Sequence, residues 1–125
     1  MPALAVWLLG WIPIGIHAAE GLPEEVSVAQ AKAKKEAGAL IIDVRERAEY
    51  EQMHIPGALH ISLGQLEQHA RSLPRNKEII VVCRSGGRSA VARDILKRAG
   101  FLNVSSMSEG MLGWKAAGYP VVKGP

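Results

Sequence analysis

One cysteine followed by a basic, glycine-rich stretch is the part of this sequence best suited to chemistry. Residues 83–89 read CRSGGRS, and Cys83 is the single cysteine among the 125 residues. Two adjacent glycines let the backbone curl so that several of its N–H groups face a common centre. Arg84 and Arg88 add positive charge, and a helix expected from about Ser89 adds the positive end of its dipole. The stretch is therefore predicted to be an anion cradle that lowers the pKa of Cys83.

The chemistry predicted for this stretch is nucleophilic attack by an anionic sulfur. A lowered pKa supplies the thiolate near neutral pH without a neighbouring base. An inert buried cysteine beside a flexible turn is the alternative, but a cysteine at a strand end followed by glycines, arginines and a helix start is a specific combination. A small anionic sulfur donor such as thiosulfate would fit the cradle. The residues expected to bind it are Arg84, Ser85, Gly86, Gly87, Arg88 and Ser89.

The composition fits one soluble globular domain with a small-molecule substrate. The formal net charge of +3 comes from 15 Lys and Arg and 12 Asp and Glu, which are mixed along the chain. Because no basic run stands out, no nucleic-acid partner is expected. A lone cysteine permits no intrachain disulfide and no multi-cysteine metal cage. The histidines form no recognisable metal set with Cys83, so neither a metal nor another cofactor is expected.

The elements that would position the cysteine alternate between strands and helices. The runs at 39–44 and 78–83 are apolar apart from Asp43 and Glu78, as in strands buried on both faces. This alternation predicts an α/β domain with a mainly parallel, five-stranded sheet flanked by helices. Ligands bind at the carboxyl ends of such strands, which is where Cys83 lies. Shorter strands are expected at 26–28, 59–61 and 104–107, and helices at 28–37, 47–53, 63–73, 89–99 and 110–117.

The first twenty residues differ from the rest of the chain. Residues 3–19 contain no Asp, Glu, Lys or Arg and are rich in Leu, Ile and Trp. Small Ala18 and Ala19 lie where a processing site would be expected, so residues 1–20 are predicted to be a signal peptide that exports the protein, for example to the periplasm. An uncleaved membrane anchor is the alternative, since no Lys or Arg precedes the apolar core and His17 lies close to the expected cut.

Three stretches of the sequence together resemble the single-domain rhodaneses, a family of thiosulfate sulfurtransferases. Residues 83–89 resemble the family's six-residue active loop, which begins with the persulfide cysteine. The residues IIDVR at 41–45, followed by Glu49-Tyr50 and HIPGA at 54–58, resemble its N-terminal signature. The residues EGMLGW at 109–114 resemble its C-terminal signature.

The resemblance covers about residues 26–122 and implies a rhodanese fold, with residues 21–125 as the rhodanese domain. It also implies that Cys83 carries a sulfane sulfur as a persulfide and moves it from thiosulfate or a similar donor to a thiophilic acceptor, cyanide or a thiol. A non-catalytic persulfide carrier that delivers sulfur to a protein partner is a second hypothesis, and a thiol redox sensor is a third. The oligomeric state is left open.

A phosphatase is less favoured by the length of the active loop. Dual-specificity phosphatases share the rhodanese fold, but their active loop is one residue longer and fits a phosphate. In this sequence only four residues separate Cys83 from Arg88. The resemblance therefore favours sulfur over phosphate as the substrate.

Several residues outside the loop carry separate expectations. Asp43 and Arg45 either support the active loop through charge-assisted hydrogen bonds, or Asp43 caps the next helix. His54 is expected to be a packing residue, and Trp114 to hold the last helix against the core. Glu109 stands where the family often has glycine, so the resemblance leaves the geometry of that turn open.

Overall fold

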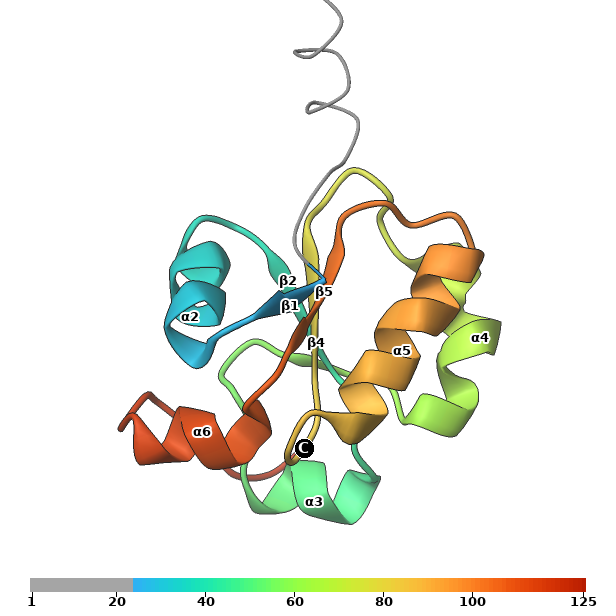
Figure 1. Ribbon diagram of the computed structural model, residues 1–125. Coiled ribbons are helices and arrows are strands. Elements are labelled where there is room, and N and C mark those ends of the chain that lie inside the picture. Colours follow the sequence, from blue (N-terminus) through green and yellow to red (C-terminus); the bar gives the residue numbers. More distant parts are fainter. Residues whose placement is uncertain (1–23) are drawn as a thin grey trace, which may run out of the picture.

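Five short strands form one parallel sheet in residues 24–125, the part of the chain that the computed structural model describes (Figure 1). Every neighbouring pair in the sheet is parallel, in the order β1-β5-β4-β2-β3. The predicted α/β class with a parallel sheet is therefore confirmed. The strands are β1 (Glu25–Val26), β2 (Leu40–Asp43), β3 (Leu59–His60), β4 (Ile79–Val82) and β5 (Val104–Met107).

The central strand β4 leads directly into the cysteine. It lies between β5 and β2, and its residue Ile80 is in register with Ile41 of β2 and Ser105 of β5. All four β4 side chains have no exposed surface, because helices cover both faces of the sheet. Cys83 therefore follows the most thoroughly buried strand, at the carboxyl edge of the sheet.

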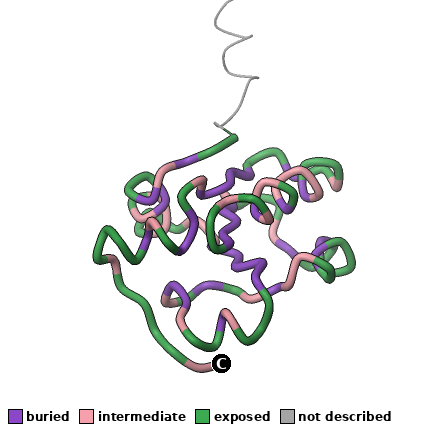
Figure 2. The backbone as a smooth tube through the Cα atoms, turned by 60° about the horizontal axis from the view of Figure 1, so that its bottom comes forward, coloured by how far each residue is buried: buried purple, intermediate pink, exposed green. Residues whose placement is uncertain are grey.

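Helices pack on both faces of the sheet (Figure 1). One face is covered by α2 (Val28–Glu36) and α6 (Gly110–Ala116), the other by α4 (Leu66–His69) and α5 (Gly87–Arg98), and α3 (Arg47–Gln52) lies at the lower end of the view. Each face has its own apolar cluster, and buried chain runs through the middle of the molecule (Figure 2). The helix side of these clusters is formed mainly by Leu66, Ala92 and Leu96 on one face and by Ala31, Met111 and Trp114 on the other.

The prediction of one continuous helix at 63–73 is wrong. The segment consists of a 3₁₀ turn at Leu63–Gln65, the four-residue α4, and a second 3₁₀ turn at Ala70–Ser72. Only Leu66, Ala70 and Leu73 are buried along it, so a short apolar stripe is enough to hold it against α5 and the sheet.

Ser27 was expected either in the first strand or as the cap of the helix that follows, and in the structure it is the helix cap. The strand expected at 26–28 is instead Glu25–Val26, because Ser27 caps α2. The Ser27 Oγ accepts a hydrogen bond from the backbone N–H of Gln30 at 3.1 Å, and the Gln30 side chain accepts one from the Ser27 N–H at 2.8 Å. This reciprocal capping box fixes the end of β1 and the beginning of α2.

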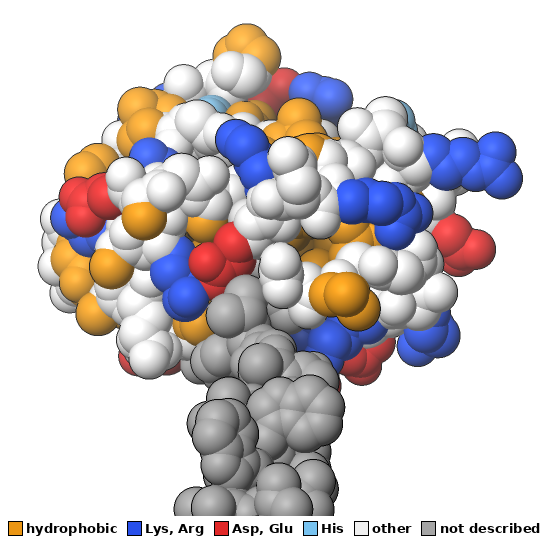
Figure 3. Space-filling view, turned by 90° about the horizontal axis from the view of Figure 1, so that it is seen from above, with side chains coloured by type: hydrophobic (Ala, Val, Ile, Leu, Met, Phe, Trp, Pro, Cys, Tyr) orange, Lys and Arg blue, Asp and Glu red, His pale blue; other side chains and the backbone are white. Residues whose placement is uncertain are grey.

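The expectation of a signal peptide or membrane anchor falls on residues 1–20, which lie outside the described residues. Among residues 24–125, no helix is long and apolar enough to cross a membrane. Figure 3 shows the end of the molecule opposite the cysteine, where Lys and Arg side chains are interspersed with Asp and Glu.

Candidate active site

The chain after β4 folds around the sulfur of Cys83. The backbone N–H groups of Gly86 and Ser89 donate hydrogen bonds to Sγ at 3.1 and 3.3 Å. Gly86 has a φ of +105° and lies against the backbone of Ser108, so a side chain at this position would be strained and would collide with the Ser108 carbonyl. Because Gly86 precedes it in this conformation, α5 begins at Gly87, two residues earlier than expected, and its first turn faces the sulfur.

A buried pair of hydroxyl groups continues from the sulfur toward β5. Ser89 Oγ lies 3.5 Å from Cys83 Sγ, 3.1 Å from the Gly86 carbonyl oxygen and 2.7 Å from Ser106 Oγ. Ser89 and Ser106 both have no exposed surface. The sequence analysis missed Ser106, because it lies on a neighbouring strand far along the chain. The feature of the sequence that could have indicated Ser106 is the pair of serines inside the otherwise apolar strand β5.

Two opposing effects set the acidity of the Cys83 thiol. Burial raises its pKa, since a thiolate is poorly solvated at a residue that is only 1% exposed. Hydrogen bonds from the Ser89 hydroxyl and from the N–H groups of Ser89, Gly86 and Ser85 lower it by more, so that the pKa lies below its ordinary value. The direction is that expected from the sequence. The largest single stabilising contact comes from a hydroxyl rather than from an arginine.

Arg88 points to a carboxylate on α3. Its guanidinium donates two hydrogen bonds to Glu49, at 2.7 and 3.0 Å. This bidentate contact lowers the pKa of Glu49 to about 2 and raises that of Arg88. Glu49 thus neutralises much of the charge that Arg88 was expected to offer to a substrate, and the pair fastens the first turn of α5 to α3.

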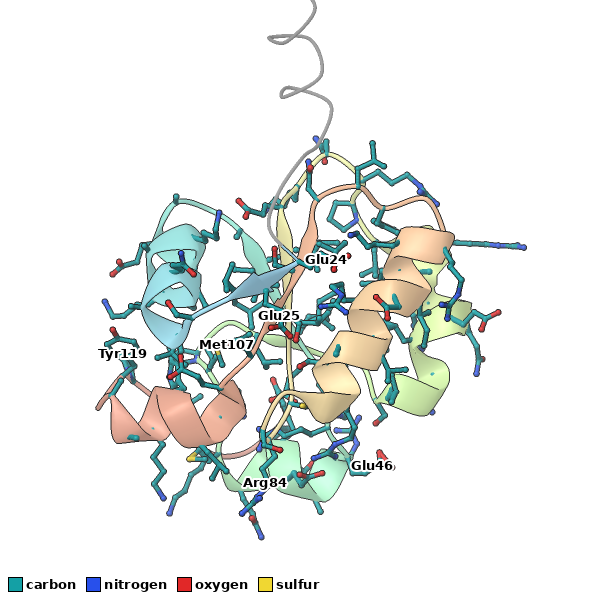
Figure 4. All side chains as sticks on the ribbon, in the orientation of Figure 1. Glu24, Glu25, Glu46, Arg84, Met107 and Tyr119 are labelled. Atoms are coloured by element: carbon teal, nitrogen blue, oxygen red, sulfur yellow. The ribbon has the colours of Figure 1, made fainter. Side chains whose placement is uncertain are left out.

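Arg84, unlike Arg88, has a guanidinium group that is not paired with a carboxylate within the described residues. Its side chain is exposed, and in the described part of the chain it forms no ion pair or side-chain hydrogen bond. Figure 4 shows it projecting from the lower end of the molecule, beside α3. Arg84 thus leaves one uncompensated positive charge on the loop that begins at Cys83.

Asp43 and Arg45 form a buried ion pair at the end of β2. The Arg45 guanidinium donates to the Asp43 carboxylate at 2.7 to 3.1 Å and to the Met53 carbonyl oxygen at 2.6 Å. The expected alternative of a helix cap is wrong for Asp43, because Glu46 is the N-cap of α3. Within residues 24–125 neither side chain bonds to the loop at 83–89. The pair instead fixes the turn into α3, the helix that carries Glu49.

Comparison with known proteins connects this geometry to a family. A model of the Rhodanese-like domain family matches residues 27–117. The chain belongs to the rhodanese family. The crystal structure of a rhodanese-related protein from Thermoplasma volcanium is similar to this rhodanese domain with a TM-score of 0.74 and 31% identity, over 80% of this chain and 98% of that one. The family and fold expected from the sequence motifs are confirmed.

Two relatives of this rhodanese domain carry names that concern sulfur transfer in general. The chain is 39% identical over 104 residues to the putative sulfur carrier protein YrkF of Bacillus subtilis, which covers 80% of this chain and 56% of that protein. It is 34% identical over 91 residues to the thiosulfate sulfurtransferase GlpE of Pseudomonas syringae. That match covers 73% of this chain and 85% of GlpE. This chain therefore spans only about half the length of YrkF, but most of GlpE.

The C-terminal signature of this rhodanese domain holds the loop from the other side. The N–H groups of Met111 and Leu112, at the start of α6, donate to the carbonyl oxygens of Cys83 and Arg84 at 2.8 and 3.1 Å. Gly110 has a φ of +62° and lies so close to the Arg84 backbone that no side chain would fit. The second glycine of the family motif is thus required by this close contact.

Glu109, the departure from the common rhodanese pattern, has a local role. Its carboxylate accepts a hydrogen bond from the N–H of Val28 at 3.0 Å, in the first turn of α2. A carboxylate at a helix N-terminus satisfies a free backbone donor and interacts favourably with the helix dipole. Glu109 therefore adds a contact between α6 and α2 and leaves the turn at Gly110 intact.

His54 and Trp114 are packing residues, as expected. The ring of His54 stacks on Tyr50 with 3.8 Å between centroids, and its Nδ1 lies 2.9 Å from the Tyr50 carbonyl oxygen. Trp114 is 1% exposed and donates through its indole N–H to the Pro120 carbonyl oxygen at 2.9 Å. Within residues 24–125, no group of three or more His, Cys, Asp and Glu side chains is arranged to hold a metal ion.

Proposed function

We propose that this protein is a sulfurtransferase that moves a sulfane sulfur from thiosulfate or a similar donor to a thiophilic acceptor, cyanide or a thiol, through a persulfide on Cys83. The observation that carries the proposal is the convergence of the Gly86 N–H and the Ser89 N–H on the sulfur atom of Cys83, with the Ser89 hydroxyl 3.5 Å away, where it accepts from the thiol and can donate to the thiolate. These groups stabilise the Cys83 thiolate, which is the nucleophile when sulfur is loaded and the leaving group when sulfur is delivered. The relatives YrkF and GlpE support sulfur as the transferred atom.

Loading begins when the Cys83 thiolate attacks the outer sulfur of thiosulfate. The new Sγ–S bond forms as the S–S bond of thiosulfate breaks, and sulfite leaves with the electron pair. The unpaired cation of Arg84 attracts the dianionic donor, while Arg88 holds the loop in place through Glu49. We expect the N–H groups that donate to Sγ to stabilise the charge of the persulfide as well.

The sulfur is delivered to the acceptor by a second displacement, in which Cys83 is the leaving group. The thiophile attacks the terminal sulfur of the persulfide, the Sγ–S bond breaks, and Cys83 is released as a thiolate. Cyanide becomes thiocyanate, and a thiol becomes a persulfide. The hydrogen bonds that lower the pKa of Cys83 make it a better leaving group in this step.

The test is intact mass spectrometry of the protein before and after thiosulfate, with Cys83→Ser alongside. The expected result is a gain of about 32 Da, one sulfur atom, that cyanide reverses and the variant lacks. Absence of the gain in the wild-type protein, or its persistence in the variant, would remove thiosulfate loading of Cys83 from the proposal.

A persulfide carrier is the second candidate, favoured by the similarity to the putative sulfur carrier YrkF. Such a protein would load sulfur on Cys83 but release it slowly to small acceptors and quickly to a protein partner. Steady-state formation of thiocyanate separates the two functions. Many turnovers per loaded protein support the enzyme, whereas stoichiometric loading without turnover supports the carrier.

We further propose that residues 1–20 export the protein, for example to the periplasm, or anchor it to a membrane if they are not removed. The support is the uncharged apolar run of residues 3–19. The intact mass of protein recovered from a cell envelope tests this. A species that begins near Glu20 indicates cleavage, the full-length species in the membrane fraction indicates an anchor, and full-length protein in the cytosol contradicts both.

A further inference from the structure

The strands begin at the end of the molecule opposite Cys83, at the top of Figure 1. Because β1 runs parallel to β5, the chain that precedes Glu24 leaves toward this end. The backbone N–H of Ser106 donates to the Glu24 carbonyl oxygen at 2.9 Å, which fixes the point of entry beside β5. The loops 74–78 and 99–103, which lead into β4 and β5, form the surface here, and we call it the amino-end face.

Direct contacts hold the two loops of the amino-end face side by side. The Ile79 N–H donates to the Asn103 carbonyl oxygen at 2.8 Å, where β4 and β5 begin. The Arg75 guanidinium lies over the ring of Phe101, 4.4 Å from its centroid. Leu102 follows Phe101 directly, so its side chain and the cation of Arg75 belong to one fixed surface.

The charge left on the amino-end face is positive. Arg75 and Lys77 are exposed and form no ion pair within the described residues. The acidic side chains of the face and of the chain entry already have basic partners, at 2.7 Å in the pair Lys34–Glu78 and at 2.9 Å in the pair Lys97–Glu24. Figure 3 looks onto this end and shows Lys and Arg side chains at several places on its surface.

Leu102 gives the amino-end face an apolar contact. Its side chain is 81% exposed, the largest exposure of any large hydrophobic residue in the described part of the chain. Contact with an anionic bilayer combines burial of apolar side chains at the acyl boundary with attraction of basic side chains to the headgroups. A leucine on the same fixed surface as two unpaired cations supplies both parts.

The chain before β1 is short enough to hold this face at a membrane. The uncharged apolar run of residues 3–19 ends five residues before Glu24, where the hydrogen bond to β5 begins. The link of residues 20–23 spans at most about 14 Å when fully extended. If the apolar run stays in a bilayer, the amino-end face is therefore the part of the domain nearest to it, and Cys83 lies at the opposite end.

We propose that the amino-end face binds the surface of an anionic lipid bilayer, with Leu102 at the acyl boundary and Arg75 and Lys77 against the headgroups. The inference rests on the anchored form of the localisation proposed above and goes beyond the proposed sulfur transfer. The contact orients the domain so that the loop at 83–89 points away from the membrane. Cys83 then exchanges sulfur with molecules in the aqueous phase rather than with molecules dissolved in the bilayer.

The experiment measures how fast single lysines of the full-length chain are acylated by a membrane-impermeant succinimidyl ester. The protein is reconstituted into vesicles of phosphatidylcholine alone, or of phosphatidylcholine and phosphatidylglycerol in equal parts. Lys77 reports on the amino-end face, and Lys123, exposed at the opposite end beside α3, is the internal reference. Because the reagent reaches only domains outside the vesicle, the ratio of the two rates does not depend on how the protein inserts.

In the wild-type protein the rate at Lys77 relative to Lys123 is expected to be about fivefold or more lower in the anionic vesicles than in the neutral ones. Each basic side chain near an anionic surface favours contact by about fivefold, and contact shields the amine from the reagent. High salt should restore the ratio, since it screens the attraction to the headgroups.

Two variants that keep both reporter lysines test which side chains make the contact. Arg75→Gln/Leu102→Ser removes one cation and the exposed leucine of the amino-end face, and it should lose most of the difference between the two lipids. The matched control is Leu112→Ser/Lys115→Gln, which removes an exposed leucine and a cation from α6, near the opposite end. The control should behave as the wild-type protein does.

The inference is overturned by an equal ratio in the two lipids, by a test variant that matches the wild-type protein, or by a control that loses as much as the test variant. Recovery from the cell envelope of only a cleaved species that begins near Glu20 overturns it as well, because no anchor then holds the face at a membrane. Formation of thiocyanate by the same preparations tests sulfur transfer separately, so its absence counts against the proposed function and not against the membrane contact.

Discussion

The hydroxyl pair of Ser89 and Ser106 gives a quantitative expectation for the acidity of Cys83. A hydroxyl has one proton, which Ser89 directs to the Gly86 carbonyl oxygen when the cysteine is a neutral thiol. When Cys83 ionises, that proton turns toward Sγ. Because the one proton of Ser89 is used in both states, Ser106 is the donor in the 2.7 Å bond to Ser89 Oγ throughout. Ser106 is thus a positioning residue that acts on the sulfur through Ser89.

Removing these hydroxyls one at a time should raise the pKa of Cys83 by different amounts. In Ser89→Ala the thiolate loses a charge-assisted hydrogen bond, which at 3.5 Å is worth about 1–1.5 kcal/mol, or about one pKa unit. Ser106→Ala weakens the same bond indirectly and should raise the pKa by only a few tenths of a unit. Because Ser106 acts through Ser89, the double variant should match Ser89→Ala.

The assay is the pH dependence of alkylation of Cys83 by iodoacetamide, which reports the thiolate fraction. At pH values well below both pKa values, Ser89→Ala should react about threefold more slowly, since part of the tenfold loss of thiolate is offset by its greater nucleophilicity. Ser108→Ala is the matched control, because its hydroxyl contacts the Val26 carbonyl oxygen instead. An unchanged pKa in Ser89→Ala, or additive shifts in the double variant, would refute the reasoning.

Four further substitutions test the framework of the loop by chemical denaturation. Gly86→Ala should lower the free energy of unfolding by about 2 kcal/mol or more and slow sulfur loading, whereas Gly87→Ala, where a Cβ meets nothing, should change the free energy by less than about 0.5 kcal/mol. Glu49→Gln should cost about 1–2 kcal/mol near neutral pH, and this difference from wild type should fade as the pH drops from 4.5 to about 2, because a carboxylate with a lowered pKa stabilises only while ionised. Asp43→Ala should cost about 3–5 kcal/mol by leaving Arg45 buried and unpaired, and a cost below about 1 kcal/mol would contradict this account of the pair.

Local patterns in the sequence were enough to predict most of the framework. The apolar run at 78–83 identified the central strand because a strand covered on both faces has no polar side to alternate with. The adjacent glycines of residues 83–89 identified the cradle, and Gly86 is the one of the two whose positive φ other residues avoid. Both features are encoded within a few consecutive residues.

Contacts between segments far apart in the sequence could not be predicted from local patterns. Nothing near Arg88 indicates that its charge is neutralised by Glu49 on another helix. Likewise, the bond between Ser89 and Ser106 exists only because α5 returns beside β5 in the folded sheet. Such pairs depend on how elements pack, which the spacing of residues along a single chain does not specify.

The strand order has a consequence for how the protein is made. In the described sheet β1 pairs only with β5, so the first strand has no strand partner until residues 104–107 have been synthesised. The last helix then adds the Glu109 cap on α2, and Val122 closes on His54. Because these closing contacts join the two ends of the domain, the sheet is completed only when nearly the whole chain is present. If residues 1–20 do direct export, this delay keeps the emerging polypeptide unfolded long enough to cross a membrane before its sheet closes.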